Sequence, residues 1–155
     1  MSLSAKIREQ LISSFRVELA EHIETMNGGL LAVEQGRVDA QDRDATLQDI
    51  FRAAHSLKGA ARAIAVTMVE QLAHALERGL DAMQRERIDW TPEVFTACYT
   101  AIDAIEMTQA AYEAGKITPP VEALQAVAQL EPFSADSQNN GRAEPETRAG
   151  SRPAK

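Results

Sequence analysis

Residues 47–64 read LQDIFRAAHSLKGAARAI, and this stretch decides the fold. Its apolar residues return every three or four positions, which is the spacing of one face of an α-helix and not the alternation of a strand. Alanine, the best helix former, fills much of the remainder. The stretch therefore predicts a helix that begins near Asp44, buries one face and exposes the other. The buried stripe is predicted to contain Leu47, Ile50, Ala54, Leu57, Ala61 and Ile64.

The same spacing precedes this helix. It predicts one long first helix that continues through Gly28 and Gly29 and ends at Gly36, because the apolar stripe does not stop at the two glycines. The stripe of this first helix contains Ile7, Leu11, Phe15, Leu19, Ile23, Met26, Leu30 and Val33.

Start and stop signals mark three helices further along the chain. Thr67 and Glu70 have the spacing of a capping box and predict the start of a third helix. Thr91 followed by Pro92 predicts the start of a fourth, with Thr as the cap and Pro in the first turn. Gly115 closes the fourth helix, and the Thr-Pro-Pro sequence that follows predicts a short fifth helix. The last two stripes contain Val69, Leu72, Leu76, Leu80 and Met83 in the third helix, and Phe95, Cys98, Ile102, Ile105, Gln109 and Tyr112 in the fourth, while the fifth helix is predicted to run through Leu130.

Four amphipathic helices with short connections predict an all-α fold, an antiparallel four-helix bundle whose short fifth helix covers one side or end. Residues 1–133 form this domain. Residues 134–155 contain no Val, Ile, Leu, Met, Phe, Trp, Tyr or Cys. Such a segment cannot bury enough apolar surface to order itself, so we predict a disordered tail or an interdomain linker there.

Composition excludes several classes of protein. The 155 residues carry a net charge of −7 and one cysteine, Cys98, so no internal disulfide can form. No apolar run approaches the length of a membrane span, and we expect a cytoplasmic, monomeric domain. The first 133 residues hold 12 Lys and Arg against 20 Asp and Glu. This acidic surface would repel a phosphate backbone, so we expect no nucleic-acid partner.

A candidate site lies around His55. On a helical wheel at ~100° per residue, Lys58 and Arg62 fall within ~60° of His55, whereas the core stripe lies some 100° or more away. Gly59 is unusual here because a mid-helix glycine costs ~1 kcal/mol relative to alanine. It could open space beside the imidazole, or it could permit close packing against another helix, and the spacing favours neither reading.

A neutral imidazole nitrogen is a competent nucleophile toward a phosphoryl group. Phosphorylation would add roughly two negative charges, which Lys58 and Arg62 could partly offset. Two other interpretations compete with this one. In the first, the bundle is a non-catalytic helical protein-interaction module and His55 is replaceable. In the second, His55, His74 and Glu77 bind a metal, but one His-x-x-Glu pair without a repeat makes a weak site, and we predict no metal.

The segment IFRAAHSLKG at residues 50–59, with LAHALE at residues 72–77, resembles the histidine phosphotransfer (HPt) family. It is most similar to the N-terminal phosphotransfer domains of CheA-type chemotaxis histidine kinases. The resemblance covers roughly residues 5–131 and includes the five-helix layout and the trailing linker.

The resemblance implies a role for each matching residue. His55 would be the phosphoacceptor, modified on its Nε2 atom, and Lys58 would lie beside the phosphoryl oxygens. Gly59 would keep the site open. His74 and Glu77 would form a polar pair that hydrogen-bonds around the imidazole. A carboxylate that accepts the Nδ1–H bond would fix the tautomer and leave Nε2 with its lone pair.

The resemblance also implies the partners. An ATP-dependent histidine kinase domain would donate the phosphoryl group, and an aspartate of a response regulator receiver domain would accept it. ATP and Mg²⁺ would belong to the kinase domain, since this chain has no nucleotide-binding signature and is expected to bind no cofactor. The chain alone would be a phosphoryl carrier and kinase substrate, not an enzyme, although the parent protein could be a CheA-like kinase.

Three positions depart from the family pattern. Ala60, Arg62 and Ala65 stand where the CheA-type motif has glycine. These changes leave two subfamilies open: a divergent CheA-like kinase, or the HPt domain of a hybrid kinase outside chemotaxis.

Overall fold

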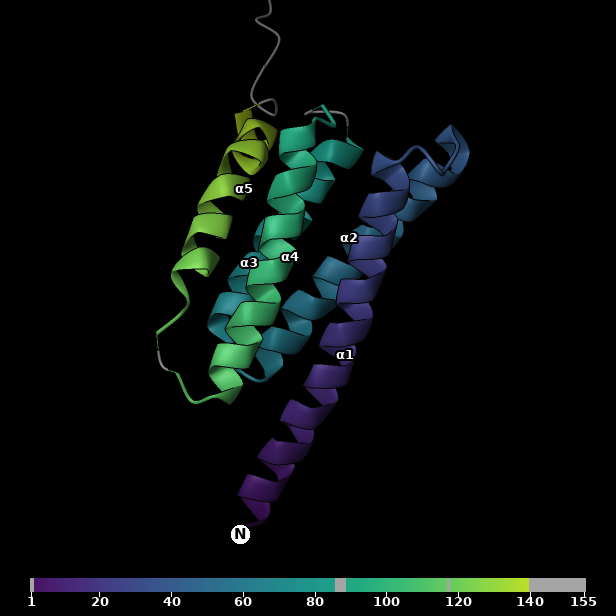
Figure 1. The fold of residues 1–155 in the computed structure, drawn as a ribbon. Helices are drawn as coiled ribbons and strands as arrows, with labels where there is room; N and C mark the ends of the chain where they lie inside the picture. The colour runs from purple at the N-terminus through teal and green to yellow at the C-terminus, as the bar shows by residue number, and fades with distance from the viewer. Residues whose placement is uncertain (1, 86–88, 117, 140–155) are drawn as a thin grey trace, which may run out of the picture.

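The computed structural model describes residues 2–85, 89–116 and 118–139. These residues form helices and no strands, which confirms the all-α class. The α2 and α3 helices form a central antiparallel hairpin, α1 packs along α2, and α5 packs against α3 and α4 (Figure 1). The elements are α1 (Leu3–Glu34), α2 (Ala40–Ala63), α3 (Thr67–Gln84), α4 (Pro92–Glu113) and α5 (Val121–Asn139).

The predicted apolar stripes meet in one core. Most stripe residues of every helix are buried, and the exceptions are informative. Ile7 and Leu11 continue the stripe of α1 in sequence but are exposed. Repeated four-residue steps drift ~40° each around a helix, so these two residues turn away from the side on which Ile12 lines a pocket against α4. The largest fully buried side chains include Met26, Leu30, Ile50, Leu57, Leu72, Leu76, Leu80, Met83, Ile102 and Ile105.

The start of α2 differs from the prediction. The helix begins at Ala40, four residues before Asp44, because Asp39 caps it. One carboxylate oxygen of Asp39 accepts the backbone N–H groups of Gln41 and Asp42 at 3.1 and 2.9 Å. An aspartate in this position satisfies backbone donors that the helix leaves without partners.

The capping box predicted for Thr67 and Glu70 is wrong. Thr67 is already helical, and the cap residue is Val66, which makes no side-chain capping bond. The Val66 carbonyl accepts the Glu70 N–H at 3.1 Å. By contrast, the prediction for α4 is confirmed, since the Thr91 hydroxyl accepts the Val94 N–H at 3.4 Å.

The α5 helix is longer than predicted. It continues past Leu130 and through Pro132 to Asn139, six residues into the segment predicted to be a tail. Once a helix is nucleated, each added residue costs little, and this segment contains no glycine before Asn139. The rest of the predicted tail, residues 140–155, lies outside the described residues.

Gly29 explains how closely α1 approaches α2. A Cβ atom at this position would lie 2.6 Å from Cγ1 of Ile50. Only a glycine lets the fully buried Ile50 side chain rest against the α1 backbone without displacement. Gly29 therefore serves core packing, although Gly28 and Gly29 interrupt the helical pattern in the sequence.

The α2–α3 turn stores backbone strain at Ala65, whose φ is +59°. The left-handed region costs a non-glycine residue on the order of 1 kcal/mol. We expect Ala65→Gly to raise the free energy of unfolding by about 0.5–1 kcal/mol, measured by urea denaturation. Ala45→Gly, at an exposed interior position of α2, is the control and should lower stability by about 1 kcal/mol. If Ala65→Gly lowered stability as Ala45→Gly does, the result would contradict backbone strain at Ala65.

Candidate functional site

His55 is presented to solvent from the middle of α2. Its neighbours Ala54 and Leu57 are fully buried and fix the rotation of the helix. The His55 side chain is consequently 62% exposed. Phe51, one turn earlier, stacks on the imidazole with ring centroids 6.3 Å apart and planes inclined by 12°.

Glu77 of α3 joins the two predicted residues of α2. Its Oε2 atom lies 3.1 Å from Nδ1 of His55 and 2.8 Å from Nζ of Lys58. Because His55 and Lys58 are one helical turn apart, a single carboxylate oxygen reaches both. Three of the five predicted site residues are therefore in direct contact, and the contact spans two helices.

Glu77 remains an anion despite its position between helices. Its side chain is only 15% exposed. Burial by itself would raise the pKa of Glu77, but the hydrogen bonds from Lys58 and His55 and their positive charge outweigh that effect, and the pKa is lowered from 4.5. A charged, well-partnered carboxylate can orient an imidazole and stabilise positive charge on it.

The geometry assigns different tasks to the two imidazole nitrogens. A carboxylate can only accept, so Nδ1 carries the proton and donates it to Glu77. The neutral ring then has its lone pair on Nε2, which makes no hydrogen bond to any described residue. The arrangement thus presents a nucleophilic nitrogen at the protein surface, with an ammonium group one turn away.

Gly59 lies on the open surface beside this group. A Cβ atom built there would meet nothing within 4 Å. Close helix–helix packing, one of the two readings left open by the sequence, is therefore wrong. The other reading, that Gly59 opens space beside the imidazole, stays a prediction.

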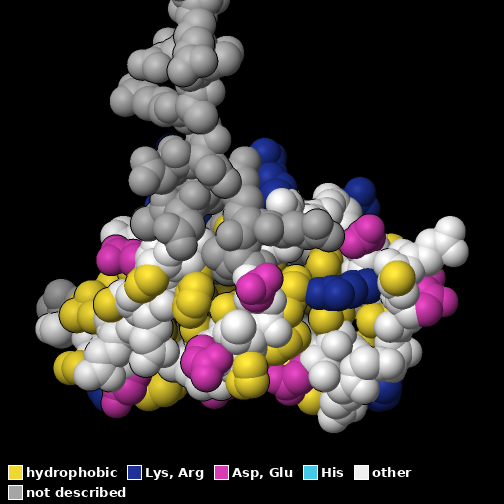
Figure 2. All heavy atoms as spheres, turned by 90° about the horizontal axis from the view of Figure 1, so that it is seen from above, with side chains coloured by type: hydrophobic (Ala, Val, Ile, Leu, Met, Phe, Trp, Pro, Cys, Tyr) yellow, Lys and Arg dark blue, Asp and Glu magenta, His cyan; other side chains and the backbone are white. Residues whose placement is uncertain are grey.

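The structure does not bring every predicted residue to the site. His74 is exposed on α3 and makes no hydrogen bond or ion pair with any described side chain. Arg62 is directed to Glu70, at 3.9 Å from its Oε1 atom. Across the described parts of the chain, no three His, Cys, Asp or Glu side chains are grouped so that they could hold a metal ion. On the end of the bundle drawn in Figure 2, Asp and Glu side chains lie among hydrophobic ones, and no histidine is visible outside the part that grey atoms cover.

The sequence-based predictions did not include two features of the site. The stacking of Phe51 on His55 could have been found from its i−4 spacing. The ion pair between Lys58 and Glu77 could not, because the pairing depends on the relative rotation of α2 and α3.

Among the described residues no helix combines the length and apolar character needed to cross a membrane.

The lowered pKa of Glu77 predicts a specific acid sensitivity. At a pH between the folded-state pKa of Glu77 and 4.5, the unfolded chain binds more protons than the folded chain. The stability due to Glu77 is therefore fully present above pH 4.5 and is lost as the pH falls through the folded-state pKa. We expect the stability difference between the wild type and Glu77→Gln to shrink from neutral pH to about pH 3, measured by urea denaturation. A difference that is constant over this range would contradict the assignment.

Comparisons with known proteins point to one family. The sequence pattern of the Hpt domain family matches residues 10–111. Chemotaxis protein CheA of Cereibacter sphaeroides is 33% identical over 118 residues, which are 76% of this chain and 17% of that protein. CheA of Bacillus subtilis is 35% identical over 107 residues, which are 68% of this chain and 15% of that protein.

A solved structure shares the fold. It is the phosphorylated P1 domain of CheA3 in complex with CheY6 from R. sphaeroides, with a TM-score of 0.70 and 21% identity over 81% of this chain and 96% of that chain. This chain spans about a sixth of the length of these two curated relatives. The family match covers more than half of the chain, and the chain therefore belongs to the Hpt domain family.

Proposed function

We propose that His55 is a phosphoacceptor in a two-component phosphorelay. Its Nε2 atom accepts a phosphoryl group from an ATP-dependent histidine kinase domain and passes it to an aspartate of a response regulator receiver domain. The observation that carries this proposal is the bond between Nδ1 of His55 and Glu77, at 3.1 Å on an imidazole that is 62% exposed. That bond leaves Nε2 free, basic and accessible to both partners.

The transfer balances with the residues present and one phosphoryl donor. The Nε2 lone pair attacks the γ-phosphorus of ATP held by the kinase domain, a P–N bond forms, the bond to the β,γ-bridging oxygen breaks, and ADP leaves. The Nδ1 proton stays on the ring and is shared with Glu77. In the second step an aspartate oxygen of the receiver attacks phosphorus, the P–N bond breaks, and the electron pair returns to Nε2.

Lys58 balances the added charge. The phosphoryl group brings roughly two negative charges, and Nζ of Lys58 already lies 2.8 Å from Glu77 on the same face. The ammonium group can turn from Glu77 toward the phosphoryl oxygens without leaving the site. At a partly exposed site this contributes about 1 kcal/mol or less, which biases the phosphorylated state without making it inert.

The relatives support the choice of partners. CheA3 P1 is itself phosphorylated and bound to CheY6 in its crystal structure, and the matched full-length proteins are chemotaxis proteins. We therefore propose a chemotaxis-type pathway, with ATP and Mg²⁺ on the kinase domain and with the reaction in the cytoplasm, where ATP is available. The domain acts as a carrier and kinase substrate.

Labelling tests this function directly. The chain is incubated with a CheA-type kinase domain, Mg²⁺ and ATP labelled in the γ-phosphate, and a receiver domain is then added. We expect a label on the chain that is labile to acid and stable to base, as for a P–N bond, and that leaves when the receiver is added. An acid-stable label, or no label, would contradict the proposal.

Gly59 predicts a trade between stability and transfer. We expect Gly59→Ala to stabilise the domain by about 1 kcal/mol, because the residue is mid-helix and a Cβ atom meets nothing there. The same methyl group occupies the face where both partners must approach, so phosphotransfer should slow about tenfold. Thermal unfolding and single-turnover labelling measure the two effects, and unchanged transfer would show that the free space has no role.

A further inference from the structure

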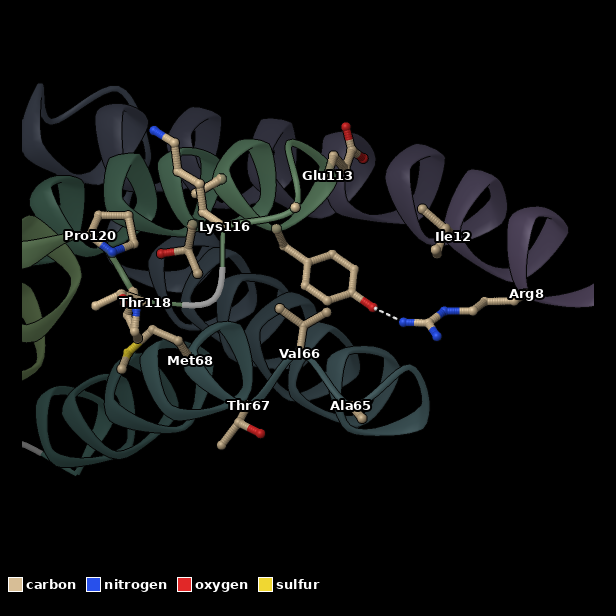
Figure 3. A pocket seen from close by; sticks show the side chains of 15 residues that line it. Arg8, Ile12, Ala65, Val66, Thr67, Met68, Glu113, Lys116, Thr118 and Pro120 are labelled. Atoms are coloured by element: carbon tan, nitrogen blue, oxygen red, sulfur yellow. Dashed lines mark hydrogen bonds between the residues drawn. The ribbon is translucent and has the colours of Figure 1, made fainter. Parts of the chain in front are cut away.

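The exposed side of α1 is the feature that the function above does not use. The opposite side is fixed by two contacts: Ile12 lines a pocket of about 540 Å³ against α4 and the α2–α3 turn, and Arg8 donates to the Tyr112 hydroxyl at 3.1 Å (Figure 3). On a wheel at ~100° per residue, Leu3, Ile7 and Val17 lie ~140–180° from Ile12. We call the side of α1 that carries these residues the outer face.

The first half of the outer face carries exposed aliphatic side chains, with the polar Gln10 and Ser14 between them. Leu3 is 75% exposed and Leu11, at the edge of this face, is 52% exposed, although both are large aliphatic residues. Val17 continues the patch. Four aliphatic side chains on one side of one helix, part of it projecting beyond the bundle (Figure 1), form an apolar patch without a cover in the described chain.

Charge divides α1 into two halves. Residues 3–17 contain three Lys or Arg and one acid, whereas residues 18–34 contain four acids and no Lys or Arg. On the outer face the contrast is between Lys6 in the first half and Glu21 and Glu24 in the second, and all three are exposed. An antiparallel copy of the same helix would bring opposite charges together at both ends of the contact.

We propose that α1 mediates weak self-association of this chain, by antiparallel pairing of two outer faces about a two-fold axis near Ser14. In this register Leu11 of one copy is level with Val17 of the other. Measured along the helix axis, Lys6 of one copy lies within ~3 Å of Glu24 of the other copy, on the same side of the contact. A two-fold contact must be self-complementary. The charged residues and the Leu11–Val17 level meet that requirement, whereas Leu3 and Ile7 lie level with the polar Thr25 and Glu21 of the other copy.

The second copy is favoured over another partner because the complementary surface is present in the chain itself. The contact involves one helix from each copy, which is small for a permanent dimer. The chain is therefore a monomer when dilute, as expected from its sequence, and associates at high local concentration. Self-association through α1 does not require the chemistry of His55.

Sedimentation equilibrium of the whole chain tests the association. With increasing concentration up to about 1 mM, we expect the mass to rise from 16.9 kDa toward twice that value. Leu11→Glu should abolish the rise. Leu124→Glu, which changes a residue of α5 that is 54% exposed, is the matched control and should leave it unchanged. A monomer at every concentration, or equal effects of the two variants, would overturn the proposal.

A charge swap tests the antiparallel register independently of folding. Lys6→Glu and Glu24→Lys should each weaken association about five- to thirtyfold, because each places like charges together twice in the dimer. The double variant restores both pairs and should associate within about threefold of the wild type. Lys116→Glu is the control for net charge. A double variant as weak as the singles would overturn this register.

Discussion

His55→Gln should reduce labelling of the chain by the kinase domain at least about 1000-fold, to background. A glutamine amide has no basic nitrogen lone pair, so no P–N bond can form at this position. The fold should survive, because the side chain is 62% exposed and makes one hydrogen bond. The measurement is the rate of label incorporation at matched protein concentration, with circular dichroism to confirm the helical fold.

His22→Gln is the control for this variant. His22 lies on α1, remote in sequence from the site, and has no part in the proposed chemistry. The His22→Gln chain should therefore be labelled on His55 at the wild-type rate. Substantial labelling of His55→Gln, with His22→Gln unchanged, would place the phosphoacceptor elsewhere.

Glu77→Gln should slow phosphorylation of His55 by about 10- to 100-fold. The amide oxygen can still accept the Nδ1 hydrogen bond, so the orientation of the ring is partly kept. The negative charge that stabilises positive charge developing on the imidazole is lost. The change also removes the ion partner of Lys58, which lies 2.8 Å away. Single-turnover labelling across a pH series measures both the rate and the pH at which the nucleophile becomes active.

Glu70→Gln is the matched control on the same helix. Glu70 lies 3.9 Å from Arg62 and does not contact the imidazole. We expect its rate to stay within about twofold of the wild type, because an exposed pair at that distance contributes little. If both variants were equally slow, the effect would come from the surface charge of α3 and not from the Nδ1 bond.

The fold follows from the sequence wherever burial decides it. The stripes of α2, α3 and α4 were predicted residue by residue because three- and four-residue spacing survives in every buried face. The errors lie at the ends of elements. Asp39 caps α2, so this helix starts earlier than predicted, and the cap of α3 is Val66 and not Thr67. Turn geometry selects the cap residue, and periodicity does not reveal it. Ile7 and Leu11 follow Phe15 at four-residue spacing, but repeated four-residue steps drift around the helix and carry both residues to its exposed side.

The site follows from the sequence less completely. The outward position of His55 could be read from a helical wheel, and Glu77 was named through the resemblance to the HPt family. The distance between them depends on how α2 and α3 pack, which no single helix pattern determines. His74 shows the limit of a motif, since it matches the family sequence and yet makes no hydrogen bond in the described structure.

The central claim is that Nε2 of His55, and not another atom, carries the phosphoryl group. Nitrogen-15 and phosphorus-31 NMR of the phosphorylated chain tests it most directly, because coupling identifies the bonded nitrogen. We predict coupling of phosphorus to Nε2 of His55, with the proton retained on Nδ1 beside Glu77. Coupling to Nδ1, or to a nitrogen of His74 or His22, would contradict this account.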